Sequence, residues 1–148
     1  MKYQIETTIS QNINLVLERF QDPEGIKKWQ RGFISLEHLS GTPGETGSKS
    51  KLKFRQGKRN MEVIETITTK QLPEKLITIY ETKGVWNEVI TRFKKIENEK
   101  TLHTSEITFK MKGMLKIMGW IMPGMFKKQS KQYMDDFKYY AETGSSLF

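Results

Sequence analysis

Hydrophobic and polar residues alternate along much of the chain, with the two-residue period that is typical of a β-strand. The first such segment runs from Tyr3 to Ile9. The later segments are separated by turn residues, including Gly57-Lys58 and Lys83-Gly84. The pattern predicts strands at 3–9 and 33–39, one strand on each side of Gly57-Lys58, and further strands at 76–82, 85–96 and 101–111.

Two short helices are predicted between the first and second strands. Ser10 is expected to cap the first helix, whose apolar residues recur at helical spacing. Asp22-Pro23-Glu24 is expected to start the second helix, because a proline in the first turn removes only an N–H that has no helical partner. This second helix carries Trp29 and ends before Gly32.

A long amphipathic helix is predicted near the end of the sequence, from about Met114 to Ala141. Pro123-Gly124 is expected either to kink this helix or to divide it into a short helix and a longer one. Beyond this point four aromatic residues recur at intervals of seven, four and three residues, and they form one stripe: Phe126, Tyr133, Phe137 and Tyr140.

These elements predict an α+β fold. A curved antiparallel sheet of about seven strands would grip the long C-terminal helix, with the two short helices after the first strand. The length of 148 residues favours one domain over residues 1–148. Any space left between the sheet and the helix would form a pocket for a small molecule.

The hairpin around Gly57-Lys58 predicts which residues face this pocket. A two-residue loop there places Lys53 opposite Glu62 on the outer face, as an ion pair across the strands. The same register places Glu65 on the apolar inner face. Desolvation of a carboxylate is costly, so the pKa of Glu65 should rise. Glu65 is therefore a candidate general acid/base or a group that grips a ligand hydroxyl or amine. The alternative is a structural role, in which it pairs with Ser50 or with a lysine.

The last two strands allow two registers. A five-residue loop aligns Phe93 with His103 and Asn87 with Phe109, whereas a four-residue loop turns one strand over. We interpret His103 as a surface residue at a strand end rather than as a catalytic group.

Composition and charge exclude several classes of function. The net charge is +8, but Lys49, Lys51, Lys53 and Arg55 alternate with uncharged residues, as expected for a solvated outer strand face. We therefore expect no nucleic-acid partner. The sequence has no cysteine and only two histidines, which argues against a metal site, and no cofactor is expected. The first residues lack the apolar run of a signal peptide, so a cytoplasmic location is expected.

Several short motifs together resemble those of a known superfamily. They are Asp22-Pro23-Glu24 with Trp29, Gly41-Thr42-Pro43-Gly44 followed by Gly47-Ser48, Glu65 followed by Leu72-Pro73, Thr101 after a polar loop, and the closing helix. Over essentially its whole length the chain resembles the START-like helix-grip (SRPBCC) superfamily, and within it the polyketide cyclase/dehydrase and lipid-transport group. The resemblance implies the fold more than the function, because that group includes carriers, cyclases and activators of chaperone ATPases without a shared catalytic set.

The preferred hypothesis is a protein that binds, and in one version transports, a small hydrophobic or amphipathic molecule between the sheet and the closing helix. One alternative is a cyclase, dehydratase or isomerase that uses Glu65 on a polyketide-like substrate. Another is a protein-interaction module such as a chaperone activator. Peripheral membrane contact near Trp120 and the oligomeric state are left open. The residues predicted to line the pocket are Trp29, Phe54, Met61, Glu65, Tyr80, Phe109, Met122, Phe126, Tyr133 and Phe137.

Overall fold

The computed structural model describes residues 1–113 and 123–148. Most of the first third of the predicted closing helix, from Met114 to Met122, lies outside the described residues. This part includes Met122, which was predicted to line the pocket, and Trp120, near which peripheral membrane contact was left open.

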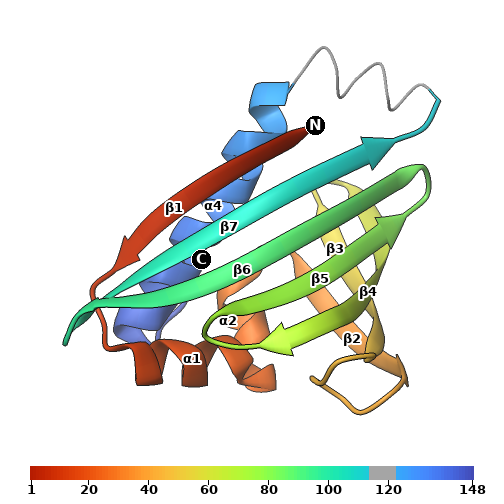
Figure 1. Ribbon diagram of the computed structural model, residues 1–148. Coiled ribbons are helices and arrows are strands. Elements are labelled where there is room, and N and C mark those ends of the chain that lie inside the picture. The colour runs from red at the N-terminus through yellow and green to blue at the C-terminus, as the bar shows by residue number, and fades with distance from the viewer. Residues whose placement is uncertain (114–122) are drawn as a thin grey trace.

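The described residues form a curved antiparallel sheet of seven strands, in the order β1-β7-β6-β5-β4-β3-β2 (Figure 1). The alternation of apolar and polar residues gives each strand one face toward the interior and one toward solvent. The predicted α+β fold is therefore confirmed. The strands are β1 (Lys2–Ile9), β2 (Phe33–Ser40), β3 (Lys49–Gln56), β4 (Arg59–Gln71), β5 (Lys75–Thr82), β6 (Val85–Glu97) and β7 (Lys100–Met111).

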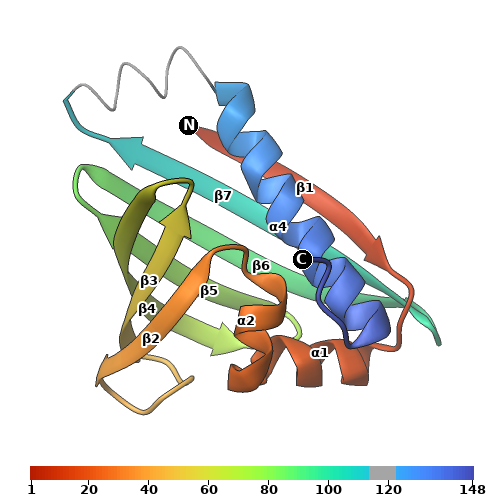
Figure 2. The ribbon, with the colours of Figure 1, turned by 180° about the vertical axis from the view of Figure 1, so that it is seen from behind.

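The helices all lie on the inner side of the sheet. Helix α4 (Pro123–Thr143) crosses β1 and β7, while α1 (Ile13–Gln21) and α2 (Ile26–Trp29) lie across one end (Figure 2). A single 3₁₀ turn, η1 (Pro23–Gly25), joins α1 to α2, and Asp22 accepts a hydrogen bond from the Glu24 N–H as a cap.

The predicted cap of the first helix is wrong by two residues. Asn12, not Ser10, accepts a hydrogen bond from the Leu15 N–H at 2.9 Å. The chain needs Ser10 and Gln11 to leave β1 before it can turn into α1. The Ser10 N–H instead donates to the Glu142 carboxylate at 2.6 Å, and this bond ties the start of the turn to the end of α4.

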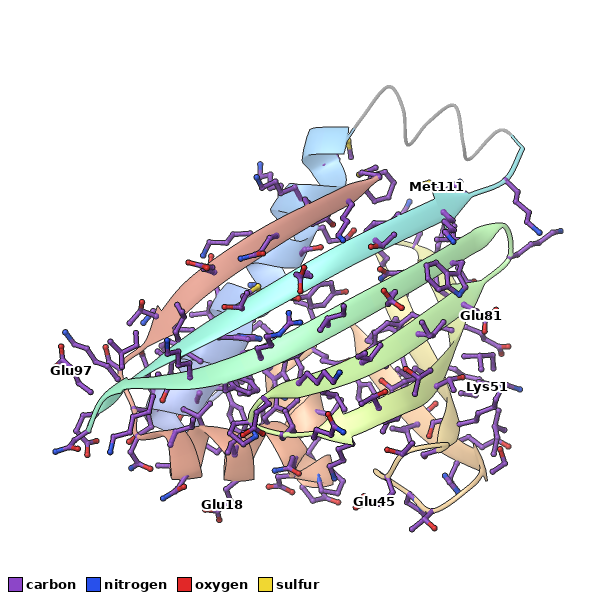
Figure 3. All side chains as sticks on the ribbon, viewed as in Figure 1. Glu18, Glu45, Lys51, Glu81, Glu97 and Met111 are labelled. Atoms are coloured by element: carbon purple, nitrogen blue, oxygen red, sulfur yellow. The ribbon has the colours of Figure 1, made fainter. Side chains whose placement is uncertain are left out.

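The predicted hairpin register around Gly57-Lys58 is confirmed. Ser50 lies opposite Glu65, and Lys53 lies opposite Glu62 with 3.7 Å between the charged atoms. The outer face carries charged side chains, among them Lys51 of β3 and Glu81 of β5, whose labelled side chains point away from the sheet (Figure 3).

In the last hairpin the register of the five-residue loop is the one observed. Phe93 pairs with His103 and Asn87 with Phe109. Only residues 98 and 99 lie between the two strands. An irregularity in the pairing between Lys95 and Glu97 shifts the register, so that Phe93 still pairs with His103.

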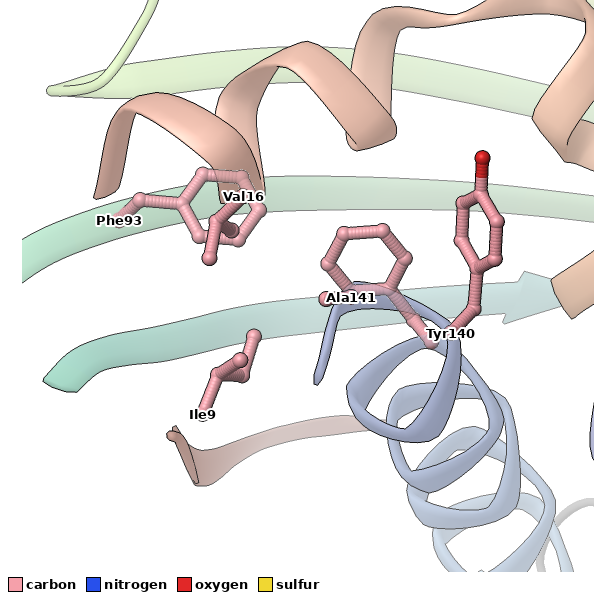
Figure 4. Close-up of a cluster of buried hydrophobic side chains, with 6 residues drawn as sticks. Ile9, Val16, Phe93, Tyr140 and Ala141 are labelled. Atoms are coloured by element: carbon pink, nitrogen blue, oxygen red, sulfur yellow. The ribbon is translucent and has the colours of Figure 1, made fainter. Parts of the chain in front are cut away.

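The main hydrophobic cluster fills the end of the molecule that α1 closes. It brings together Ile9 of β1, Val16 of α1, Phe93 of β6 and three residues of α4: Phe137, Tyr140 and Ala141 (Figure 4). Phe137 has no solvent exposure. Complete burial of such a side chain contributes about 1.5–3 kcal/mol, so this cluster is a major source of stability.

The interpretation of His103 as a surface residue is wrong. Its side chain is 5% exposed, and its ring stacks on Phe93 at 4.6 Å between centroids and meets the edge of Phe137. The register decides this outcome, because it turns His103 to the inner face. Burial lowers the pKa of His103 from 6.5 to about 3. The ring is therefore neutral at physiological pH and is part of the core.

A neutral buried histidine predicts loss of stability in acid. Between pH 6.5 and 3 the unfolded chain takes up a proton on His103 that the folded chain excludes, so stability should fall as the pH falls through this window. The loss in the free energy of unfolding that His103 can cause is at most about 5 kcal/mol at pH 3. Urea unfolding from pH 7.5 to 4 should show a smaller loss for His103→Phe than for the wild type. His38→Asn, which alters an exposed histidine, is the control. An unchanged acid slope in His103→Phe would contradict the prediction.

Candidate functional site

Four polar residues form a continuous row across the inner face of the sheet. Ser50, Glu65, Tyr80 and Asn87 lie on β3, β4, β5 and β6, and each is the direct cross-strand partner of the next. Because directly paired residues project from the same face, all four side chains point inward. We call these four residues the polar row.

Apolar residues border the polar row along the sheet. On one side lie Val63 of β4 and Val85 of β6, and on the other lie Ile67 and Val89. These four residues are all only partly buried. By contrast, Ile5 of β1 and Ile107 of β7, which lie beneath α4, are buried. These four apolar side chains are therefore less completely covered than those beneath α4, although Thr78 of β5 and Thr91 of β6 on the same face are buried.

Glu65 and Tyr80 form a linked pair in the middle of the polar row. Burial raises the pKa of Glu65, and a side-chain hydrogen bond with Tyr80 partly offsets this rise. Burial, and then the charge of Glu65, raise the pKa of Tyr80 well above its usual value. Tyr80 therefore remains a protonated phenol beside the Glu65 carboxyl group. The predicted rise in the pKa of Glu65 agrees with its position.

Tyr133 of α4 lies across the space from the polar row. It is close enough to Tyr80 to contribute to the raised pKa of that phenol. The pKa of Tyr133 is itself raised, mainly by burial and then by Asp136, while a hydrogen bond with Gln129 and the charge of Arg31 act in the opposite direction. The helix therefore adds a second phenol opposite the sheet.

An ion pair joins α4 to the connection between α2 and β2. Arg31 donates through Nε to Asp136 at 2.8 Å and through Nη2 at 3.1 Å. The Asp136 side chain is 2% exposed and the Arg31 side chain 42% exposed. Gly32 permits this connection, because its φ is +76° and a Cβ there would lie 2.1 Å from the Arg55 carbonyl oxygen. The pair fixes the helix over the sheet beside Tyr133.

The other predicted pocket residues fall into two groups. Phe54 and Met61 are cross-strand partners on the inner face of the β3–β4 hairpin, and Phe109 packs against Phe126 with 5.2 Å between ring centroids. These four residues are partly buried.

Trp29 and Phe137 lie at the end of the molecule that α1 closes, where Trp29 packs against the main hydrophobic cluster. Their ring centroids are 5.0 Å apart. The structure therefore brings Phe54, Met61, Phe109, Phe126, Tyr133, Glu65 and Tyr80 to the space between sheet and helix, whereas Trp29 and Phe137 lie at its closed end. Ligand contact stays a prediction for all of them.

The residues predicted to line the pocket did not include Asn87, Arg31 or Asp136. The position of Asp136 could have been predicted, because it lies three residues after Tyr133 and next to Phe137. A carboxylate on this apolar stripe of the helix indicates a buried group that needs a partner. Asn87 follows from the register once the last hairpin is fixed. Arg31 carried no signal, since its partner is 105 residues away.

Two surface grooves lie outside the polar row. One, of about 480 Å³, runs between β1 and the start of α4, and Lys127, Lys128 and Lys131 are among its lining residues. The other, of about 580 Å³, lies over the ends of β4 and β5 and includes Ile64 and Glu81. Within residues 1–113 and 123–148, no group of three or more His, Asp or Glu side chains is placed to hold a metal ion.

The comparisons with known proteins give matches to solved structures only, since no family model and no curated protein matches the chain. A conserved protein from Geobacillus kaustophilus has a TM-score of 0.78 at 20% identity, covering 98% of this chain and 97% of that one. An aromatase/cyclase from a Streptomyces species has a TM-score of 0.74 at 13% identity, covering 96% and 93%. Norcoclaurine synthase from Thalictrum flavum, in complex with dopamine and hydroxybenzaldehyde, has a TM-score of 0.70 at 12% identity, covering 93% and 83%.

These similarities establish the class of fold. The chain has the START-like helix-grip fold, as the resemblance in its sequence implied. Among the parts of the chain that the structure describes, no helix is both long enough and apolar enough to cross a membrane.

The raised pKa of Glu65 predicts a pH dependence opposite in sign to that of His103. Below the unfolded pKa, near 4.5, the carboxyl is protonated in both states, whereas at higher pH the folded chain must hold a partly desolvated charge. Stability associated with Glu65 is therefore lost as the pH rises through its folded pKa. Glu65→Gln should change the free energy of unfolding little at pH 4 and increase it at pH 8, relative to the wild type. Urea unfolding at both pH values measures this difference, and a stabilisation that is equal at both would contradict the prediction.

Proposed function

We propose that the protein binds a small hydrophobic or amphipathic molecule between the inner face of β3–β6 and α4. Apolar walls supply most of the affinity, at about 25 cal/mol per Å² of apolar ligand surface before the costs of binding. The polar row and Tyr133 orient the polar part of the ligand. Apolar sites with a few convergent polar groups are the usual form of small-molecule pockets.

One observation carries this proposal. The apolar residues of β4 and β6 beside the polar row keep partial exposure, although they lie on the inner face of the sheet, where Ile5, Ile107 and Leu52 are buried. Partly exposed apolar side chains on an inner face are suited to contact with a ligand. A structure with the same fold, norcoclaurine synthase, holds two small aromatic molecules, dopamine and hydroxybenzaldehyde. This parallel supports the chemical class of the ligand.

Neighbouring residues of β4 offer a matched test of the location. Val63 faces inward beside the polar row, whereas Ile64 faces outward into the 580 Å³ groove, and both are partly buried β-branched residues. The neutral fluorescent probe N-phenyl-1-naphthylamine should bind the wild type. Val63→Arg should weaken that binding at least about tenfold, because a cation on the apolar wall must be desolvated. Ile64→Arg should change it less than about twofold.

Circular dichroism and thermal melting of both variants establish that each is folded. Unchanged binding in a folded Val63→Arg would contradict the proposal. Loss of binding in Ile64→Arg alone would place the site in the outer groove instead.

A second candidate function is catalysis in the same space, as a cyclase, dehydratase or isomerase. The observation in its favour is the Glu65–Tyr80 pair, because a carboxyl group with a raised pKa beside a protonated phenol can take up and return a proton on a bound substrate. Turnover that Glu65→Gln abolishes, while probe binding persists, would favour the enzyme. Turnover retained in that variant would exclude Glu65 as the acid/base.

A further inference from the structure

The side-chain oxygen of Asn87 is a buried acceptor. Among the described residues, Asn87 Oδ1 has no hydrogen-bond partner. Asn87 lies on the inner face of β6, at the end of the polar row, and the side chain as a whole is only partly buried. A buried carbonyl oxygen without a donor is costly, and native proteins satisfy most such groups.

The neighbours of Asn87 do not supply this donor. Tyr80, its partner on β5, does not donate to it. Its partner on β7 is Phe109, and the inward residues before and after it on β6 are Val85 and Val89. Ser50, at the other end of the polar row, is three strands away, roughly 14 Å at the usual strand spacing. No residue that the structure describes therefore donates to this oxygen.

The charges around this space disfavour an anionic ligand. Glu65 is a carboxyl group two strands from Asn87, and Asn87 Oδ1 is itself an acceptor. Arg31, whose charge acts on Tyr133, is bound by both oxygens of Asp136, and Lys131 of α4 is paired with Asp135. Of the residues that the structure describes around this space, a carboxylate or phosphate would meet Glu65 and Asn87 Oδ1 as acceptors, and the two cations named above are already paired.

We propose that Asn87 Oδ1 is the polar anchor of the pocket, and that the ligand is a neutral apolar molecule with a hydroxyl or N–H donor rather than a fatty acid or another anion. This inference rests on the proposed binding function and names the ligand class. The ligand donor approaches Asn87 beside Phe109, while the apolar part of the ligand lies along Val89 and toward Tyr133.

Three naphthalenes that share one ring system test the ligand class. The first, 2-naphthol, carries a donor; 2-methoxynaphthalene carries only an acceptor; 2-naphthoate is an anion. Each displaces N-phenyl-1-naphthylamine, whose own dissociation constant is measured for every variant. In the wild type, 2-naphthol should bind about five- to tenfold more tightly than 2-methoxynaphthalene, as expected for one hydrogen bond to a buried acceptor. The anion 2-naphthoate should bind most weakly.

Variants of Asn87 test the anchor. Asn87→Leu should reduce the preference for 2-naphthol to less than about twofold and keep the affinity for 2-methoxynaphthalene. Asn87→Val gives the same readout if the leucine variant does not fold, since valine already occupies positions 85 and 89. Asn98→Leu changes an exposed asparagine in the β6–β7 turn and should keep the preference of the wild type.

The outcomes separate this inference from the function on which it rests. Equal binding of the three naphthalenes by the wild type would overturn the donor preference and leave the binding function standing. A preference that persists in Asn87→Leu would overturn Asn87 as the anchor. Failure of the probe and of all three naphthalenes to bind would overturn both proposals.

Discussion

The width of the sheet relative to one helix is the constraint on which the rest of this structure depends. Seven strands at about 4.8 Å spacing span roughly 30 Å, whereas a helix with its side chains is about 10 Å across. Helix α4 can therefore cover only part of the inner face, and it packs over β1 and β7. The apolar side chains of β4 and β6 beside the polar row stay partly exposed and form the wall of the proposed site. The candidate site follows from this geometry.

The two ends of the inner face have different roles. At one end α1 and α4 enclose the main hydrophobic cluster, in which Phe93, His103 and Phe137 pack ring against ring. Toward the other end the wall carries the polar row and a less complete covering. The ion pair between Arg31 and Asp136 links these two ends of the inner face. It fixes the connection between α2 and β2 to the helix that carries Tyr133. Stability is therefore concentrated where binding is not proposed.

Much of the fold and part of the site could be predicted from the sequence. The alternation of residues around Gly57-Lys58 fixed the hairpin register, so the inward position of Glu65 followed from local pattern alone. His103 could not be placed in this way, because its face depended on a loop whose length allowed two registers. The Arg31–Asp136 pair depends on contacts between segments distant in sequence, which no local pattern reports. Asn87 had the right residue type, but its buried oxygen is visible only once neighbouring strands are in place.

The fold alone does not decide between binding and catalysis, since the same architecture carries an aromatase/cyclase and a norcoclaurine synthase. What distinguishes this chain is the set of side chains on the inner wall, where one carboxyl group, a phenol and an unpartnered amide oxygen lie among aliphatic residues. The central claim is that this wall, rather than either surface groove, is where a small molecule binds.

The most direct test is a titration of the ¹⁵N-labelled protein with N-phenyl-1-naphthylamine, followed by amide chemical shifts in NMR spectra. The account predicts that the largest shifts cluster at Val63, Tyr80, Asn87 and Tyr133, on the two sides of the space between sheet and helix. Shifts confined to Asn60 and Glu81, or to Gln4 and Lys127, would place binding in a surface groove and contradict it.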